Sequence, residues 1–374
     1  MDLPHLKSLA GKLESSATKL RGQSVVTGFD GFVDEMITVV DERADENSYT
    51  RVPTISRFSE LVKAASGMSS LREIVVTKTD PGGCAINMGD GLASLGLAVT
   101  TFATAGEPVH AAFSEYSNKA ALHSWGREPG RTLAYEFSDG KLMHSSVSHL
   151  AEFTPDYIRK RLQEGVFQAS CEKAQLIALT DWTLYPHMTE CWRFLQESVF
   201  NQLPRRIPFF IDLVDPSNRS ETDIREMLKV LPGFESCGPC TLGLNQNEAN
   251  ILSKLLHLEF ADQPGIKAAA KQARELRQAL GITEVLIHSL RYAVLATPDG
   301  ESEAEGPYCE DPVKSTGAGD RFNAGYAAGL LLELEPPLRI RLACASSGLY
   351  VRKGSSPTME ELIEFVRNWA SDNV

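Results

Sequence analysis

The sequence predicts an α/β fold of three layers, with helices on both faces of a central, mostly parallel β-sheet. Short apolar runs rich in β-branched residues alternate with longer amphipathic patterns, and from about residue 150 onward the order is strand, helix, strand, helix. The chain has 374 residues, 43% of them hydrophobic, which is enough to form a large core. We therefore expect one domain over residues 20–374, with a small β-element set apart from the main sheet.

The period of the hydrophobic pattern defines the individual elements. Short continuous or alternating apolar runs predict strands, and apolar residues three and four positions apart predict helices. The expected strands are residues 24–29, 36–40, 74–77, 99–103, 176–180, 207–212, 240–244, 284–288 and 292–297. The expected helices are residues 154–167, 188–200, 248–257, 266–280, 318–334, 337–351 and 358–370.

Two regions, residues 35–79 and 131–147, interrupt the alternation of strand and helix. The second contains two strand-like runs joined by Ser138-Asp139-Gly140, which is typical of a hairpin turn. A hairpin inside an α/β chain predicts a small β-element outside the main sheet, and over a binding site such an element is a lid. Because an exposed strand edge favours pairing with another chain, we also expect a homodimer formed through the lid.

Charge and composition restrict the classes of partner. The formal net charge of −12 argues against nucleic acid or an anionic membrane, because both are bound through clusters of basic residues. No run approaches the ~20 apolar residues that span a bilayer, and the N-terminal region lacks the continuous apolar segment of a secretory signal. Seven scattered cysteines are typical of reduced thiols in the cytosol. We expect a cytoplasmic protein whose partners are small molecules.

The segment Thr316-Gly317-Ala318-Gly319-Asp320 has the composition of an anion-binding turn. Its two glycines let the backbone approach a ligand closely, and the N-terminus of the following helix adds a partial positive charge. Asp320 would repel bound phosphates, so we interpret it as a base that accepts a proton from an attacking hydroxyl. The alternative is an ordinary helix start, with Asp320 interacting favourably with the helix N-terminus.

These residues belong to a larger pattern. Residues 316–330 resemble the second signature of the ribokinase-like (PfkB) carbohydrate kinases, and Gly82-Gly83 and Asn87 lie in a segment that resembles the first. Further matching segments are Gly28–Asp34, Asp212 with Asp215–Arg219, Asn245–Glu248 and residues 351–358, in the order found in the family. The resemblance implies the ribokinase-like fold with a β lid and the activity of a sugar kinase, a phosphotransferase with an alcohol group as acceptor.

The resemblance also implies residue roles. Asp320 is then the catalytic base, beside an anion hole formed by Gly317, Ala318 and Gly319. The implied sugar-binding residues are Asp30, Asp34, Gly82, Gly83 and Asn87. The implied nucleotide-binding residues are Asn245, His288, Ser289, Thr316, Gly317 and Gly319. Glu248 and Asn245 would organise the Mg²⁺ of the nucleotide, usually through water, and the segment 351–358 would hold a monovalent cation.

Simpler explanations stay open for three of these motifs. Asn245 and Glu248 also have the spacing of a capping box at a helix start, and both roles can hold together. Apart from the resemblance, a plain tight turn is the favoured explanation of Gly82-Gly83. An Asp-Pro turn explains Asp215–Arg219 as well as the resemblance does.

The sequence departs from the family pattern in two places. Lys314-Ser315 stand where the family commonly has Asp-Thr, and Lys314 either neutralises charge near the phosphates or points to solvent. The usual glycine-bearing nucleotide segment is replaced by Ile287–Val294. That run, together with Gly28–Asp34, more closely resembles the ADP-dependent sugar kinases of the same superfamily. ATP is the expected donor, and ADP stays open as the alternative.

Two other classes of function compete with the sugar kinase. Cys237-Gly238-Pro239-Cys240 has redox-type spacing, but it leads directly into a strand instead of starting a helix, which favours two thiols in a turn. A non-catalytic sugar- or nucleotide-binding protein on the same fold is the second alternative. Neither the sugar nor the hydroxyl that is phosphorylated follows from the sequence.

Overall fold

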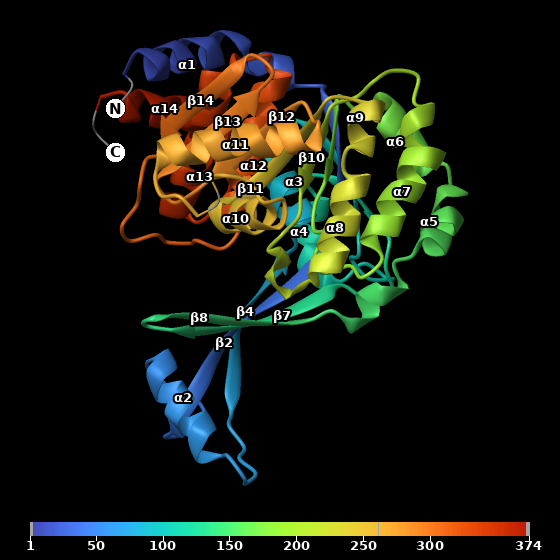
Figure 1. The fold of residues 1–374 in the computed structure, drawn as a ribbon. Helices are drawn as coiled ribbons and strands as arrows, with labels where there is room; N and C mark the ends of the chain where they lie inside the picture. The colour runs from blue at the N-terminus through green and yellow to red at the C-terminus, as the bar shows by residue number, and fades with distance from the viewer. Residues whose placement is uncertain (1–2, 261, 372–374) are drawn as a thin grey trace.

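The computed structural model describes residues 3–260 and 262–371 and has a nine-stranded central sheet (Figure 1). The strand order is β14-β13-β12-β11-β10-β9-β1-β5-β6, with every neighbouring pair parallel except β12–β13 and β13–β14. The strands are β1 (Ser24–Phe29), β5 (Ala98–Ala103), β6 (Ala121–Ser124), β9 (Leu176–Leu179), β10 (Phe209–Asp212), β11 (Cys240–Asn245), β12 (Glu284–His288), β13 (Tyr292–Thr297) and β14 (Gly300–Glu305).

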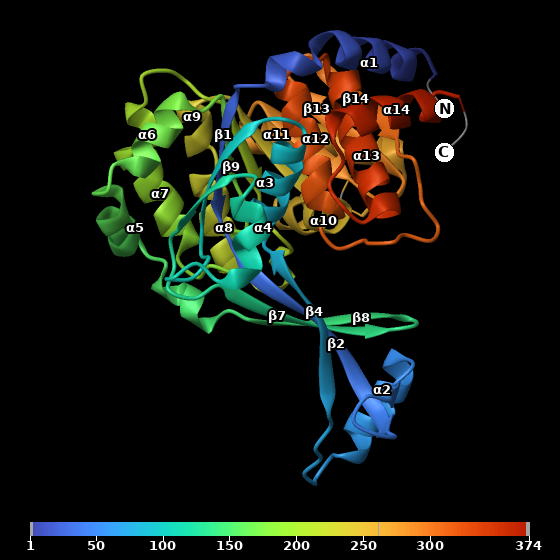
Figure 2. The same ribbon diagram turned by 180° about the vertical axis from the view of Figure 1, so that it is seen from behind.

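Helices cover both faces of this sheet, which confirms the predicted three-layer α/β fold (Figures 1 and 2). One face carries α5 (Pro155–Leu162), α6 (Val166–Lys173), α7 (Met188–Ser198), α8 (Glu221–Val230), α9 (Gly233–Cys237), α10 (Gln246–Leu255) and α11 (Ile266–Leu280). The other carries α1 (Leu3–Ser16), α3 (Cys84–Ser94), α4 (Ser114–Ser117), α12 (Ala318–Leu331), α13 (Pro336–Lys353) and α14 (Met359–Trp369).

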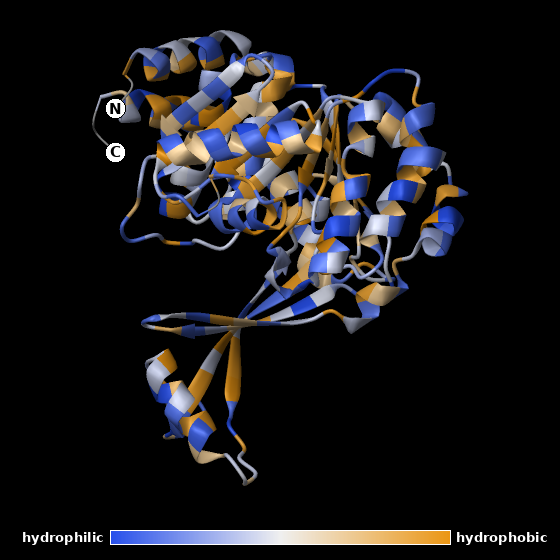
Figure 3. Ribbon diagram, in the orientation of Figure 1, coloured by the Kyte–Doolittle hydropathy of each residue, from blue (hydrophilic) through white to orange (hydrophobic). Residues whose placement is uncertain are grey.

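Each face of the sheet has its own hydrophobic core. Successive side chains of a strand point to opposite faces, so Phe209 and Ile211 of β10 lie in one core and Phe210 lies in the other. Figure 3 shows hydrophobic residues concentrated along the central strands and hydrophilic residues on the outward faces of the covering helices.

A smaller sheet projects from the main body (Figures 1 and 2). It contains β2 (Phe32–Arg43), β3 (Tyr49–Arg51), β4 (Ile74–Gly82), β7 (Gly130–Phe137) and β8 (Gly140–Ser146), and α2 (Ile55–Ala64) lies against it. The long strand β2 pairs antiparallel with β3 and β4 and parallel with β7. The two segments predicted as a lid, residues 35–79 and 131–147, lie in this sheet, and Val39, Val52 and Phe137 form a small core within it.

Two of the differences from the sequence expectation concern helices. The helix expected over residues 154–167 is split into α5 and α6, because Gly165 adopts a left-handed conformation with φ +73° between them. The helix α1 lies before the predicted domain start at residue 20, but Leu6, Leu9 and Leu13 are buried in the core and α1 packs against α14. The packed unit therefore begins earlier than the boundary that we predicted.

No helix in the described part of the chain is long and apolar enough to cross a bilayer.

Candidate active site

The candidate active site lies where parallel strands of the main sheet end. Asp30 follows β1, Asp181 follows β9, Asp212 ends β10 and Asn245 ends β11. Because these four strands are neighbours in the sheet, their carboxyl ends bring the four side chains to one edge, the usual place for a ligand in an open α/β sheet. The N-terminal ends of α3 and α12 meet the same edge.

Asp30 holds the start of α3. Its Oδ1 atom accepts hydrogen bonds from the backbone N–H of Ala85 at 2.8 Å and the hydroxyl of Thr180 at 2.7 Å, and its Oδ2 atom accepts one from the N–H of Cys84. The residue is only 1% exposed, and burial raises the pKa of its carboxyl. These contacts assign Asp30 a structural role at the helix start, while its contact with sugar stays a prediction.

Asp34 lies on β2, at the base of the small projecting sheet. Because this sheet contains the segments predicted as a lid, we call it the lid sheet. Burial raises its pKa to about 6, while a hydrogen bond with Thr132 and the positive charge of Lys314 oppose that rise. Gly82 on β4 faces it so closely that a Cβ atom there would overlap the Asp34 carboxylate. Gly83 adopts φ +97°, and a Cβ atom there would lie 2.8 Å from the carbonyl oxygen of Asp30. The two glycines therefore make room for the two aspartates, which a plain turn would not require.

Lys314 joins the loop before α12 to the lid sheet. Its Nζ atom lies 3.3 Å from Oδ2 of Asp80 on β4, and its side chain is 32% exposed. The side chain is thus paired and close to Asp34, and does not extend freely into solvent.

The Gly317–Asp320 turn starts α12 as predicted. Gly317 adopts a left-handed conformation with φ +81° as the N-cap, and Asp320 lies in the first turn, only 8% exposed. Burial raises the pKa of Asp320 to about 7, with Asp212 adding to the rise, while Arg321 and a hydrogen bond with the Cys84 side chain lower it. A carboxylate with a pKa near neutral pH is suited to accept a proton.

Asp320 belongs to a group of buried carboxyls. Burial raises the pKa of Asp212 to about 6, and the amide of Asn323 donates a hydrogen bond of 2.6 Å to its Oδ2 atom. Asp181 also has a raised pKa, caused by burial and by the charges of Asp30, Asp212 and Asp320. Such a concentration of negative charge favours a cationic ligand or protonation.

Asn245 and Glu248 form the capping box of α10. The Asn245 side chain accepts a hydrogen bond from the N–H of Glu248 at 3.0 Å, and the Glu248 carboxylate accepts one from the N–H of Asn245 at 2.7 Å. Burial raises the pKa of Glu248 to about 8, and the charge of Asp212 is the second cause. Within the described residues no group of three or more His, Cys, Asp or Glu is arranged to hold a metal ion directly.

A cavity of about 500 Å³ lies on the other side of the turn. Ala318 and Gly319 line it together with three other predicted residues, Asn245, His288 and Ser289. His288 packs on Phe322 with ring centroids 4.7 Å apart, and burial lowers its pKa to about 4, so the imidazole is neutral at pH 7. The Ser289 hydroxyl accepts hydrogen bonds from the backbone N–H groups of Arg291 and Tyr292 and so closes the β12–β13 turn.

Several lining residues of this cavity were not predicted from the sequence. They come from the start of β13, from loops and from α13, which only the folded chain brings together: Tyr292, Pro307, Tyr308, Cys344, Ser347 and Gly348. Thr316 does not line the cavity, and its carbonyl oxygen accepts a hydrogen bond of 2.6 Å from the hydroxyl of Tyr350.

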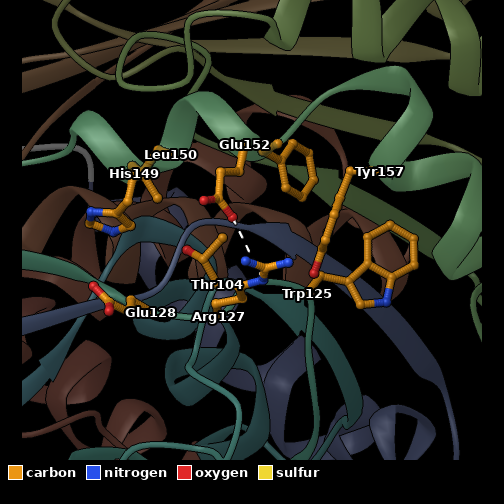
Figure 4. A pocket seen from close by; sticks show the side chains of 10 residues that line it. Thr104, Trp125, Arg127, Glu128, His149, Leu150, Glu152 and Tyr157 are labelled. Carbon is orange, nitrogen blue, oxygen red and sulfur yellow. Dashed lines mark ion pairs between the residues drawn. The ribbon is translucent and has the colours of Figure 1, made fainter.

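A second, smaller cavity of about 200 Å³ lies beside the base of the lid sheet (Figure 4). Trp125 and Tyr157 form part of its wall, and Arg127 lies 3.9 Å from the carboxylate of Glu152 across it. None of the predicted catalytic, sugar or nucleotide residues lines this cavity, so it is separate from the group of residues described above.

The cysteine pair does not have the environment of a redox site. Burial raises the pKa of Cys237 to about 11 and that of Cys240 well above its usual value, whereas a reactive thiol has a lowered pKa. Cys237 ends the short helix α9, and both thiols are free. The structure thus favours two buried structural thiols.

Fold and site together define a sugar kinase with the ribokinase-like fold, a phosphotransferase with an alcohol acceptor. The description "prokaryotic ketohexokinase" belongs to the family model that matches residues 7–369, and the chain is a member of that family. A ketohexokinase from Haloferax volcanii is 27% identical over 361 residues, which cover 95% of this chain and 94% of the relative. A ribokinase from Haemophilus influenzae is 32% identical over 129 residues, 33% of this chain and 40% of the relative.

Solved structures support the fold. The ribokinase of Thermotoga maritima matches with a TM-score of 0.63 at 16% identity, covering 92% of this chain and 99% of its own. A phosphofructokinase-2 variant from Escherichia coli matches with a TM-score of 0.62 at 13% identity, covering 93% of this chain and 99% of its own. These matches confirm the predicted ribokinase-like architecture, whereas the lid role of the small projecting sheet stays a prediction.

Proposed function

We propose that this sugar kinase transfers the terminal phosphoryl group of MgATP to a hydroxyl of a ketohexose such as fructose, with Asp320 as the general base. The acceptor class is suggested by the description of the family and by the name of the Haloferax volcanii relative. The donor and the base are the ones that the resemblance to carbohydrate kinases implies.

The position of Asp320 carries the proposal. Its carboxyl lies in the first turn of α12, close to Cys84 at the start of α3, while the adjoining Ala318 and Gly319 line the 500 Å³ cavity. A nucleotide in that cavity and a sugar beside α3 would both reach the turn. Asp320 would accept the proton of the sugar hydroxyl, and the N-terminus of α12 would stabilise negative charge on the transferred group.

The sugar would lie between α3 and the base of the lid sheet. Asp34 accepts hydroxyl donors there, and Asn87 offers both a donor and an acceptor. Asn87 is close to the Gly317–Asp320 turn, which we call the phosphate turn. A Cβ atom at Gly317 would lie 3.5 Å from the Nδ2 atom of Asn87. The lid sheet would then exclude water, which prevents transfer of the phosphoryl group to water.

The acidic groups fit Mg²⁺ carried by the nucleotide. The negative charge of Asp212 helps to raise the pKa of Glu248, so a divalent cation nearby would stabilise both as anions. Glu248, with Asn245, would bind the ion through water, and the ion would neutralise charge on the nucleotide phosphates. A monovalent cation near residues 351–358, a cytoplasmic location and a dimer through the lid are further parts of this proposal.

Phosphosugar formation, measured by mass spectrometry, tests the proposed function. Fructose and a panel of other sugars are offered with Mg²⁺ and either ATP or ADP, and we expect phosphorylated ketohexose with ATP. Product only with ADP would show that ADP, and not ATP, is the donor. Product only with another sugar would show that the acceptor is not a ketohexose. No product with either donor from folded protein would favour the non-catalytic binding protein.

The variant Asp320→Asn tests the base. We expect turnover to fall by roughly 10²–10⁴-fold, the usual contribution of a general base, while the dissociation constant for the sugar changes little. Turnover equal to that of the unsubstituted protein would refute the role of Asp320.

A further inference from the structure

Arg321, the residue after Asp320, is buried behind the phosphate turn. Its Nη2 atom lies 3.1 Å from Oδ2 of Asp90, its Nε atom donates a hydrogen bond of 3.0 Å to the Ser356 hydroxyl, and its guanidinium lies 4.6 Å from the ring centre of Tyr350. The Nη1 atom is in addition 3.4 Å from the carbonyl oxygen of Gly317. A charged side chain that is almost fully buried needs such partners, because its desolvation is costly.

The partners of Arg321 are themselves fixed. Asp90 Oδ1 lies 2.8 Å from Nζ of Lys119, and the Ser356 hydroxyl donates a hydrogen bond of 2.5 Å to Asp90 Oδ2. The hydroxyl of Tyr350 donates to the carbonyl of Thr316. The network therefore connects α3, α12, α13 and the loop after α13.

This network acts on the backbone of the phosphate turn. The carbonyls of Thr316 and Gly317 are both held on the side of Tyr350 and Arg321. Because the C=O and N–H of a trans peptide point in opposite directions, fixing the Thr316 carbonyl turns the N–H of Gly317 away from the network. A Cβ atom at Gly317 would lie 2.6 Å from Nη1 of Arg321, so guanidinium and turn are in direct contact.

The network also reaches the helix assigned to sugar binding. Asp90 lies on α3 three residues after Asn87, so the ion pair ties the helix that begins at Cys84 to the turn that begins α12. Within a sugar kinase, these are the two elements whose separation sets the distance between acceptor hydroxyl and phosphoryl group. A misplacement of about 1 Å in such an arrangement costs roughly 10²-fold in rate.

We propose that Arg321 is a positioning residue of the phosphoryl transfer, which, paired with Asp90, fixes the phosphate turn against the sugar-binding helix. The inference rests on the proposed role of the turn, but not on the identity of the sugar or of the donor. The sugar and donor that the unsubstituted protein uses are therefore determined first. A failure of the fructose or ATP assignment then leaves this test intact.

The experiment compares Arg321→Ala, Arg321→Lys and Asp90→Asn with a matched control, Arg367→Ala, which removes the exposed ion pair between Arg367 and Glu14. We expect kcat to fall at least about tenfold in Arg321→Ala, with a smaller fall in Asp90→Asn and no change in the control. Added guanidinium ion at millimolar concentration should restore part of kcat in Arg321→Ala alone. Arg321→Lys should keep the charge but lose the forked contacts, so we expect intermediate activity.

A pH profile separates positioning from a purely structural role. Arg321 lowers the pKa of Asp320, so its removal should move the acidic limb of the kcat profile to higher pH, whereas Arg321→Lys should leave that limb in place. A folded Arg321→Ala with unchanged kcat and pH profile would overturn the proposal, as would a loss confined to melting temperature. If Arg321→Ala does not fold, an unchanged kcat in both Arg321→Lys and Asp90→Asn would overturn it equally.

Discussion

At the scale of single residues, the candidate active site is dominated by carboxyl groups whose anionic form is disfavoured by burial. The pKa of Asp34 and of Asp212 rises to about 6, that of Asp320 to about 7 and that of Glu248 to about 8. A fold does not gain stability from such a group, which indicates selection for chemistry or for a cationic ligand.

This cost predicts that Asp320→Asn stabilises the protein. The pKa of Asp320 is 3.8 as a free group and about 7 when folded, so its penalty is absent below about pH 4 and grows as the pH rises to about 7. Asparagine removes a penalty on the order of a few kcal/mol at pH 8. We expect a higher melting temperature at pH 8 and a smaller gain at pH 5, measured in EDTA without substrates.

Asp299→Asn, in the exposed turn between β13 and β14, is the matched control. It should leave the melting temperature unchanged at both pH 8 and pH 5. A gain for Asp320→Asn of equal size at both pH values would contradict the electrostatic explanation, and so would a loss at both.

The sequence predicted the residues of local motifs but not their distant partners. Gly317–Asp320 was found because its composition and spacing already describe an anion-binding turn. Arg321 lies next to it in sequence, but its partner Asp90 is 231 positions away, and no periodic pattern relates the two. The roles of Tyr350 and Ser356 were missed for the same reason.

At the scale of elements, prediction succeeded where local pattern determines the structure. The strands β1, β12 and β13 and the helix α11 have the predicted bounds. The strand β4 is longer than predicted, reaching Gly82, because its second half pairs antiparallel with β2 through residues that carry no alternating apolar pattern. Tertiary pairing there outweighs the weak local preference.

The variant Gly82→Ala tests whether this extension of β4 matters for sugar binding. The added methyl group would overlap the Asp34 carboxylate, so Asp34 or β4 must move. We expect KM for the sugar to rise about tenfold or more, with a smaller effect on KM for the nucleotide, because the phosphate turn is not touched. Steady-state kinetics with each substrate varied in turn give the two constants.

Gly11→Ala on α1 is the matched control, since no atom outside the adjoining backbone of its own helix lies within 4 Å of the added Cβ. It should leave both constants unchanged. An unchanged KM for the sugar in Gly82→Ala would show that Asp34 does not contact the acceptor.

At the scale of the whole molecule, the candidate site lies at the junction of two bodies. The main sheet and its helices supply the phosphate turn and the buried carboxyls of Asp181, Asp212 and Asp320. The strand β2, which contains Asp34, runs from the main body into the projecting sheet (Figure 1). Lys314 and Asp80 connect the two bodies across the site. Displacement of the small sheet would therefore first change the part of the site that contains Asp34, which we propose to contact the sugar.

This arrangement leads to a prediction about assembly. In the described part of the chain, β4 pairs only with β2, and its Ile74 and Val76 side chains are 42% and 45% exposed. An exposed apolar edge strand favours pairing with a second copy. We expect a mass twice the chain mass of 41.0 kDa by light scattering, and a monomer for Val76→Glu, because a buried unpaired carboxylate opposes association.

Val109→Glu, at an equally exposed valine on the main body, is the control and should remain a dimer. We also expect the Val76→Glu monomer to have a raised KM for the sugar, because the lid sheet that carries Asp34 would lose its support from the second copy. A monomeric unsubstituted protein, or a dimer that survives Val76→Glu, would contradict association through the β4 edge. The lid would then function within a single chain, positioned by its connections to β1 and α3 and by the ion pair between Lys314 and Asp80.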